Sequence, residues 1–132
     1  MSLIKKILLI KFMLILSLNV CAQEVKKIGK FKDWETMILN DTNGRVCFAQ
    51  TKPVLQSPKK NIRDARLFVS FRPTEKITDE ISITAGYDFN KQNSITAKSG
   101  KHKYKFDIAQ QKFAWIADKK IEKKMIRTMK KG

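Results

Sequence analysis

The stretch Asp64-Ala65-Arg66-Leu67-Phe68-Val69-Ser70-Phe71-Arg72-Pro73 decides how the rest of this 132-residue chain can be read. Alternate side chains of a β-strand point to opposite faces of the sheet. One face of a strand over residues 65–72 would carry Ala65, Leu67, Val69 and Phe71, and the other Arg66, Phe68, Ser70 and Arg72. Pro73 has no N–H to donate, so it ends the strand. We expect a strand with one buried face and one mixed face, which other segments pair with or cover.

Six further segments carry strand or hairpin signals. Ile81 and Ile83 begin a clean alternation over residues 80–89. Asn43-Gly44 predicts a tight hairpin, and Pro53 and Pro58 predict a loop over residues 52–62. The predicted strands cover residues 31–39, 45–51, 65–72, 80–89, 94–98, 103–108 and 113–117, the last marked by Phe113, Trp115 and Ala117. Short strands joined by polar turns favour an all-β sandwich or barrel.

The period of the pattern changes at Asp118, a suitable helix N-cap. The apolar residues that follow have helical spacing: Ile121, Met125, Ile126 and Met129. Lysines surround them, and Glu122 suits the positive end of the helix dipole. A C-terminal basic amphipathic helix is therefore predicted. Such a helix can pack on a sheet or lie on an anionic membrane, and its short apolar stripe favours packing.

Residues 1–22 have the three parts of a secretory signal peptide. Lys5 and Lys6 precede an apolar centre over residues 7–18, and small residues follow it. We expect cleavage between Ala22 and Gln23, which sends the protein to the periplasm or the outer envelope.

Two alternatives remain for this segment. An uncleaved membrane anchor is disfavoured by Lys11, because a charge inside hydrocarbon is costly. A lipoprotein acylated at Cys21 is disfavoured by the bulky Val20 that precedes this cysteine.

Cleavage would leave a leader over residues 23–30, expected to be mobile, and one domain over residues 31–132. The whole chain carries a net charge of +16, and the mature part has 25 basic against 12 acidic residues, or +13. Such a charge favours anionic partners, including lipid headgroups and lipopolysaccharide phosphate. The candidate contacts are Lys98, Lys101, Lys103, Lys105, Lys119, Lys120, Lys123 and Lys124. The alternative is a solvated face whose lysines are compositional.

The sequence offers no catalytic set. His102 is the only histidine and lies in a Gly-Lys-His-Lys turn, where a solvated role is expected. Clusters of His, Cys and carboxylate with metal-ligand spacing are missing from the sequence as well. We therefore expect no enzyme, no cofactor and no metal. Nucleic acid is not the expected partner, because Tyr104 is in phase with core residues rather than with the lysines beside it.

Several motifs together resemble the invasion-associated locus B family, small exported proteins of alphaproteobacteria. They are Trp34, Val46-Cys47-Phe48-Ala49, Arg66 to Pro73, Ser99-Gly100, Tyr104-Lys105-Phe106 and Phe113-Ala114-Trp115. The resemblance implies an immunoglobulin-like antiparallel β-sandwich at the cell envelope. Similar proteins continue with further strands and a late cysteine suited to pairing with the one at Cys47, so this chain is expected to be missing its last strands.

Cys47 is thus a disulfide candidate that lacks its partner. The residues alone leave an intermolecular bond, a free thiol or a small buried hydrophobe open for it. For function, we expect a non-enzymatic envelope protein that binds a protein or an envelope component. The alternative is an electrostatic binder of polyanions or of an anionic membrane surface through its lysine-rich face.

Overall fold

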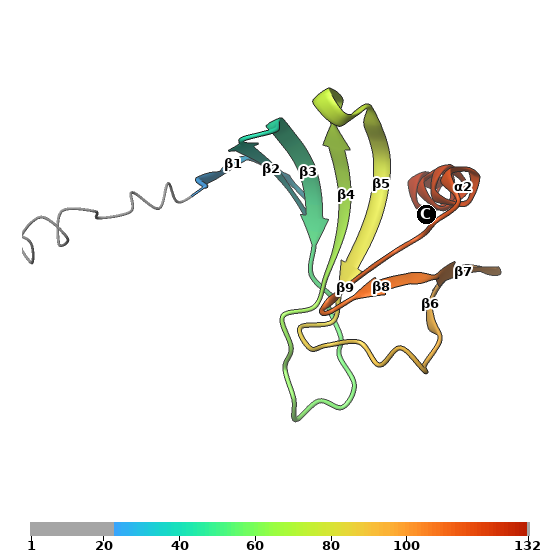
Figure 1. The fold of residues 1–132 in the computed structure, drawn as a ribbon. Coiled ribbons are helices and arrows are strands. Elements are labelled where there is room, and N and C mark those ends of the chain that lie inside the picture. Colours follow the sequence, from blue (N-terminus) through green and yellow to red (C-terminus); the bar gives the residue numbers. More distant parts are fainter. Residues whose placement is uncertain (1–22, 132) are drawn as a thin grey trace, which may run out of the picture.

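The computed structural model describes residues 23–131 and shows an all-β fold with one C-terminal helix (Figure 1). The strands are β1 (Val25–Phe31), β2 (Trp34–Asp41), β3 (Gly44–Thr51), β4 (Arg66–Arg72), β5 (Ile77–Thr84), β6 (Ile95–Ser99), β7 (His102–Phe106), β8 (Ile108–Gln110) and β9 (Phe113–Trp115). A 3₁₀ turn, η1 (Pro73–Glu75), links β4 to β5, and the helix is α2 (Lys119–Lys131). The predicted all-β, sandwich-like fold with a basic C-terminal helix is confirmed. The predicted signal peptide, with Cys21 and Ala22, lies outside the described residues.

The main sheet is antiparallel and has seven strands in the order β1-β2-β3-β4-β5-β9-β8. The stretch that begins at Asp64 therefore supplies the central strand, β4. Leu67 and Val69 of β4 face the core, as the alternation predicted, while Phe71 on the same face remains 38% exposed. The mixed face predicted for Arg66, Phe68, Ser70 and Arg72 is the opposite face of the sheet.

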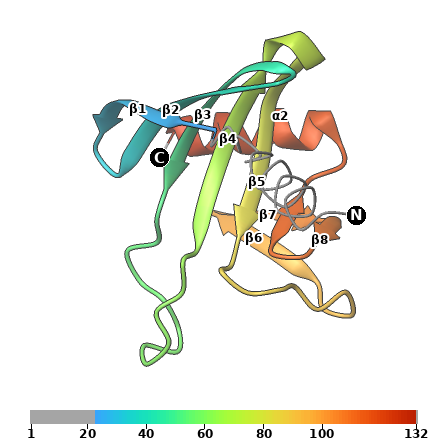
Figure 2. The ribbon, with the colours of Figure 1, turned by 60° about the vertical axis from the view of Figure 1, so that its left-hand side comes forward.

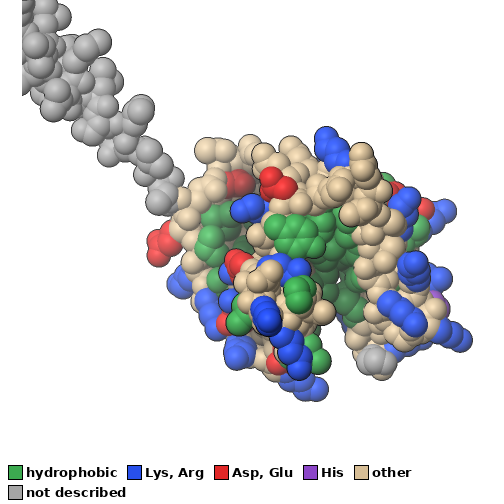
Figure 3. Space-filling view, turned by 90° about the horizontal axis from the view of Figure 1, so that it is seen from below, with side chains coloured by type: hydrophobic (Ala, Val, Ile, Leu, Met, Phe, Trp, Pro, Cys, Tyr) green, Lys and Arg blue, Asp and Glu red, His purple; other side chains and the backbone are tan. Residues whose placement is uncertain are grey.

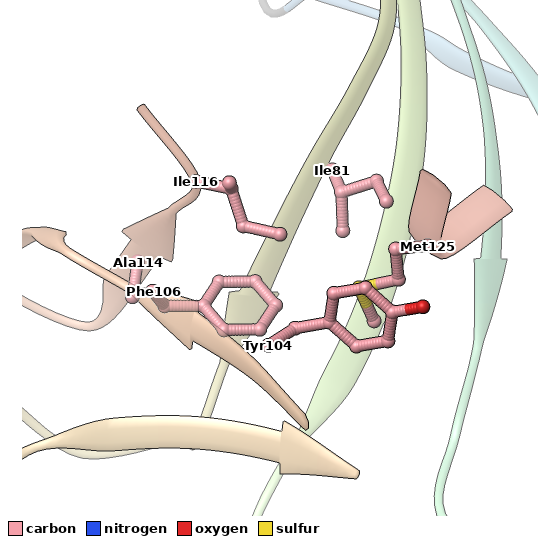
Figure 4. Close-up of a cluster of buried hydrophobic side chains, with 6 residues drawn as sticks. All are labelled: Ile81, Tyr104, Phe106, Ala114, Ile116 and Met125. Atoms are coloured by element: carbon pink, nitrogen blue, oxygen red, sulfur yellow. The ribbon is translucent and has the colours of Figure 1, made fainter. Parts of the chain in front are cut away.

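The second layer consists of the hairpin β6–β7 and the helix α2. Figures 1 and 2 both place them on the same side of the main sheet. The fully buried core lies between the layers and joins Ile81 of β5, the β9 region, the hairpin and the helix (Figure 4). Its members are Ile81, Tyr104, Phe106, Ala114, Ile116 and Met125. Most of this core covers β5 and β9, so β1 to β3 extend beyond it.

The helix α2 starts as predicted at an Asp118 cap. The Asp118 Oδ1 accepts a hydrogen bond from the Lys120 backbone N–H at 2.7 Å, which satisfies a donor left free at the helix start. Met125 is buried, whereas Ile121, expected in the apolar stripe, is 39% exposed. Glu122 takes the inward position instead and is only 1% exposed.

The burial of Glu122 has a clear cause at the edge of β5. β9 pairs with β5 only as far as Trp115, opposite Ser82. One residue before Ser82, the Ile81 backbone N–H points to the side of β5 where β9 no longer pairs. Glu122 Oε1 accepts its hydrogen bond at 3.0 Å. Glu122 Oε2 accepts a second bond from Lys119 Nζ at 2.9 Å. A helix carboxylate thus completes a strand ladder that β9 leaves unfinished.

Residues 25–30, which belong to the expected mobile leader of residues 23–30, instead form the edge strand β1 together with Phe31. Backbone pairing with β2 explains this correction, since the register runs from Val25 opposite Leu39 to Phe31 opposite Trp34. A bulge interrupts the register between Lys27 and Gly29. Three exposed lysines stand along this edge: Lys26, Lys27 and Lys30.

Several other boundaries also differ from the predictions. The strand expected over residues 80–89 runs from Ile77 to Thr84, because the chain turns at Gly86, whose φ is +78°. The strand expected over residues 103–108 is split into β7 and β8. In β9 the core-facing side chain is Ala114 and not Phe113 or Trp115, so the larger aromatic residues face outward. The hairpin of β2 and β3 is confirmed, and the Asp41 carboxylate bonds the Asn43 N–H at 2.8 Å in its turn.

Candidate functional site

Four aromatic side chains form a band across the face of the sheet opposite the hairpin and the helix. We call this band the aromatic face; its residues are Phe48, Phe68, Phe113 and Trp115. The ring centroids of Phe48 and Phe68 are 6.0 Å apart, those of Phe68 and Phe113 6.2 Å, and those of Phe113 and Trp115 5.9 Å. Strand alternation puts all four on one face, and they come from β3, β4 and β9.

The aromatic face is open to solvent, although its side chains shield the polar groups between them. Phe113 is 40% exposed, and Phe48, Phe68 and Trp115 are half-buried. Ser70 lies opposite Phe48, and Ser82 lies opposite Phe68 and Trp115, in the neighbouring strands; both serines are buried. The face is therefore a continuous aromatic surface rather than a row of isolated side chains.

A chain of polar contacts borders one end of the aromatic face. The Arg66 guanidinium binds both oxygens of Asp64, at 2.9 and 3.1 Å, and donates to Gln50 Oε1 at 3.0 Å. Gln50 Nε2 donates to Glu35 Oε2 at 3.3 Å, and Lys27 Nζ binds the other oxygen of Glu35. These contacts cross β1, β2, β3 and β4, so the border is held in place before any partner binds.

The same contacts lower the pKa of two carboxyl groups. The hydrogen bond from Lys27, helped by Gln50, lowers the pKa of Glu35 below its ordinary value of 4.5. The hydrogen bond from Arg66 lowers the pKa of Asp64 below its ordinary value of 3.8. Both carboxyl groups are therefore ionised at neutral pH, and this border keeps its charges there.

A group of ion pairs around Arg72 borders the other end of the aromatic face. Arg72 NH2 lies 2.9 and 2.8 Å from the two oxygens of Glu80, and Arg72 Nε lies 3.3 Å from Glu75 Oε2. The Nε–Glu75 contact lacks hydrogen-bond geometry, so this buried Nε–H has no hydrogen-bond acceptor among the described residues. A shallow pocket of about 400 Å³ lies beside it, bounded by Trp115 and Ile108 and by the Lys119–Glu122 pair.

The lysines predicted as polyanion contacts fall into two groups. Lys98, Lys103 and Lys105 lie on the exposed face of the hairpin β6–β7, with Lys98 directly opposite Lys103 and Lys101 at the turn. None of these four forms an ion pair with another described side chain. Figure 3 shows Lys and Arg side chains gathered around the single histidine of this hairpin.

The predicted lysines of α2 differ in whether they form an ion pair. Lys120, Lys123 and Lys124 are exposed on the outer side of α2, whereas Lys119 is bound to Glu122. Tyr104, the aromatic residue between the hairpin lysines, is 2% exposed, and its hydroxyl bonds Thr128 Oγ1 at 2.7 Å. Its predicted place in the core is confirmed, so it is not available to stack on a ligand.

The remaining candidate residues form no site. Cys47 is a half-buried free thiol on β3, opposite Phe71 on the core side of the sheet. His102 is half-buried and its ring centroid lies 6.4 Å from that of Tyr104. Within residues 23–131, the structure brings together no group of three or more His, Cys, Asp or Glu side chains that could hold a metal. No helix in this range has the length and apolar character needed to cross a membrane.

The aromatic face was not foreseen as a unit. Alternation in the sequence predicts the face of β4 that carries Phe68. It does not predict which strands lie beside β4, and the aromatic neighbours of Phe68 depend on that strand order. Comparison with protein-family models, curated proteins and solved structures found no match.

Proposed function

We propose that this chain is a non-enzymatic cell-envelope protein, related to the invasion-associated locus B proteins, that binds a protein partner through its aromatic face. The motifs around Val46 to Ala49 and Arg66 to Pro73 support the family, and the pattern of residues 1–22 supports export. Export places the protein in the periplasm or at the outer envelope, with a lipoprotein at Cys21 as the less favoured form.

The open aromatic face carries this proposal. Protein interfaces are enriched in aromatic residues and Arg at their centres and have polar rims. Here Phe68, Phe113 and Trp115 provide a contiguous apolar centre. Arg66 and Arg72 stand at its two borders, each already held by carboxylates. A partner would bury the rings without having to order the charged rim, which reduces the entropic cost of binding.

The test is the recovery of a defined partner from an envelope extract by the immobilised protein. Phe113→Asp places a charge in the most exposed ring position of the face, so we expect recovery to fall about tenfold or more. Phe31→Asp is the matched control, because Phe31 is an exposed phenylalanine, at 74%, that lies at the end of β1 outside the face. Equal recovery by both variants would exclude the aromatic face as the site. Reproducible failure to recover any defined protein would contradict the function itself.

A second candidate function is electrostatic binding of polyanions or of an anionic membrane surface. The four hairpin lysines favour it, because they share one exposed region and lack acidic partners among the described residues. Replacing Lys98, Lys101, Lys103 and Lys105 together by Gln should weaken binding to lipopolysaccharide or anionic vesicles, and added salt should weaken wild-type binding. Binding that is indifferent to salt would contradict this candidate.

A further inference from the structure

The loop of residues 52–65, between β3 and β4, carries three exposed aliphatic side chains that neither proposed surface uses. We call them the apolar group; they are Val54, Leu55 and Ile62, which are 83, 81 and 88% exposed, the highest values among the large apolar side chains described. A single exposed aliphatic residue is ordinary, but three on one projecting loop mark an interaction site. Figures 1 and 2 show the loop extending beyond the ends of the strands it joins.

Polar residues of the loop bind one another, and a turn from Pro58 to Asn61 forms the end of the loop. Gln56 Nε2 donates to the Arg63 carbonyl at 2.8 Å, and Gln56 Oε1 accepts from the Arg63 N–H at 3.1 Å. The Arg63 guanidinium donates to the Ser57 carbonyl at 2.6 Å and lies 5.5 Å from the centroid of the Tyr87 ring. The loop therefore has its own internal frame, which leaves the aliphatic side chains outside it.

The charges in the same loop as the apolar group select the kind of partner. Three exposed lysines accompany it: Lys52, Lys59 and Lys60. None of them forms an ion pair among residues 23–131. The one acidic residue of the loop, Asp64, is already bound to Arg66. Figure 3 looks onto this end of the molecule and shows hydrophobic side chains beside Lys and Arg.

We propose that the loop of residues 52–65 is a membrane-contact site that inserts its apolar group into the interface of an anionic lipid bilayer. Aliphatic side chains enter the boundary between headgroups and acyl chains, and lysines beside them attract anionic headgroups. The apolar group is aliphatic throughout and shares its loop with lysines that lack ion-pair partners among the described residues, which distinguishes it from the aromatic face and favours anionic lipid over protein. The loop adjoins the aromatic face at the Asp64–Arg66 pair, but Val54, Leu55 and Ile62 are not part of that face.

The first test places a reporter in the apolar group of the full chain. In Leu55→Trp, we expect the added tryptophan emission to shift to shorter wavelength with phosphatidylglycerol-rich vesicles, and brominated acyl chains to quench it. Vesicles of phosphatidylcholine alone should produce a much smaller shift, because the lysines gain nothing there. Difference spectra against the unmodified chain remove the signal of Trp34 and Trp115. The absence of a shift with anionic vesicles would overturn the proposal.

The second test separates insertion from simple charge attraction. Leu55→Asp should lower partitioning into anionic vesicles about tenfold or more, since it removes a buried aliphatic group and adds a charge. Ile28→Asp changes the charge equally at a 55% exposed position on β1 and should change partitioning only slightly. Both variants keep residues 1–22, so any contribution of that segment is shared.

Two results would overturn the assignment. Equal losses in Leu55→Asp and Ile28→Asp would show that attraction is electrostatic and that the apolar group does not insert. Loss of a captured envelope protein in Leu55→Asp, with no vesicle binding by the unmodified chain, would assign the loop to a protein. The Phe113→Asp experiment reports on the aromatic face alone, so the two proposals can fail independently.

Discussion

Replacing Glu122 by Ala should destabilise the fold strongly, because this helix side chain completes the hydrogen bonding of β5. The substitution leaves the buried Ile81 N–H without an acceptor, which costs about 1–3 kcal/mol. It also removes an acidic group from the first turn of α2, worth about 0.3–1 kcal/mol. We therefore expect a loss of about 1–4 kcal/mol in the free energy of unfolding. For a domain of this size the midpoint of thermal unfolding should fall by roughly 5–20 °C.

Matched variants separate the hydrogen bond from the charge. Glu122→Gln keeps an acceptor for Ile81 and nearly the same volume, so it should cost only about 1 kcal/mol. Lys123→Ala, on the exposed side of the same helix, should cost less than about 0.5 kcal/mol. Urea denaturation gives the three free energies, and amide hydrogen exchange should show loss of protection at Ile81 in Glu122→Ala only.

A Glu122→Ala variant as stable as Lys123→Ala would refute this reasoning. Unchanged protection of the Ile81 amide would refute it independently, because that N–H would then have another acceptor. The Lys119 contact alone cannot produce a large effect, since Lys119 is more than half exposed and its pairing is screened by water.

Three further substitutions test other contacts. Tyr104→Phe removes the buried hydroxyl contact to α2 and should cost about 1 kcal/mol in urea denaturation, with the ring still packed. Gly86→Ala should cost more than about 1 kcal/mol in thermal unfolding, since φ is +78° there and the new Cβ would lie 2.8 Å from the Asp64 nitrogen; an unchanged midpoint would show that this turn adapts freely. Glu35→Gln should flatten the loss of stability in acid, because the Lys27 hydrogen bond lowers the pKa of Glu35 in the folded state, so that its stabilisation is present above pH 4.5 and lost as the pH falls through the folded value. Unfolding free energies measured from neutral pH downward that show the same slope for both proteins would contradict the last prediction.

Local alternation was sufficient to predict the strands whose inward residues are aliphatic. Leu67 and Val69 in β4, and Ile81 and Ile83 in β5, face the core as their period required. The helix start was also predictable, because Asp118 acts on the N–H of Lys120, only two residues away. These features depend on neighbours in sequence.

The features that sequence could not predict depend on strand order. β1 has little apolar character of its own and is a strand because β2 offers it a free edge. The burial of Glu122 depends on where β9 ends, because that end leaves the Ile81 N–H without a strand partner. In β9 the small Ala114 faces the core, where Tyr104 and Phe106 from the second layer already fill the space. Its aromatic neighbours therefore form part of the outer surface.

The lysines of β1 protect the edge of the sheet against pairing with a strand of another molecule. An edge strand presents unpaired backbone groups to which a strand of another molecule can add, and this is how many sheets begin to aggregate. A second strand arriving at β1 would have to strip water from Lys26, Lys27 and Lys30 and to match the bulge between Lys27 and Gly29. Charge that composition alone would assign to the attraction of partners thus also keeps copies of the chain apart.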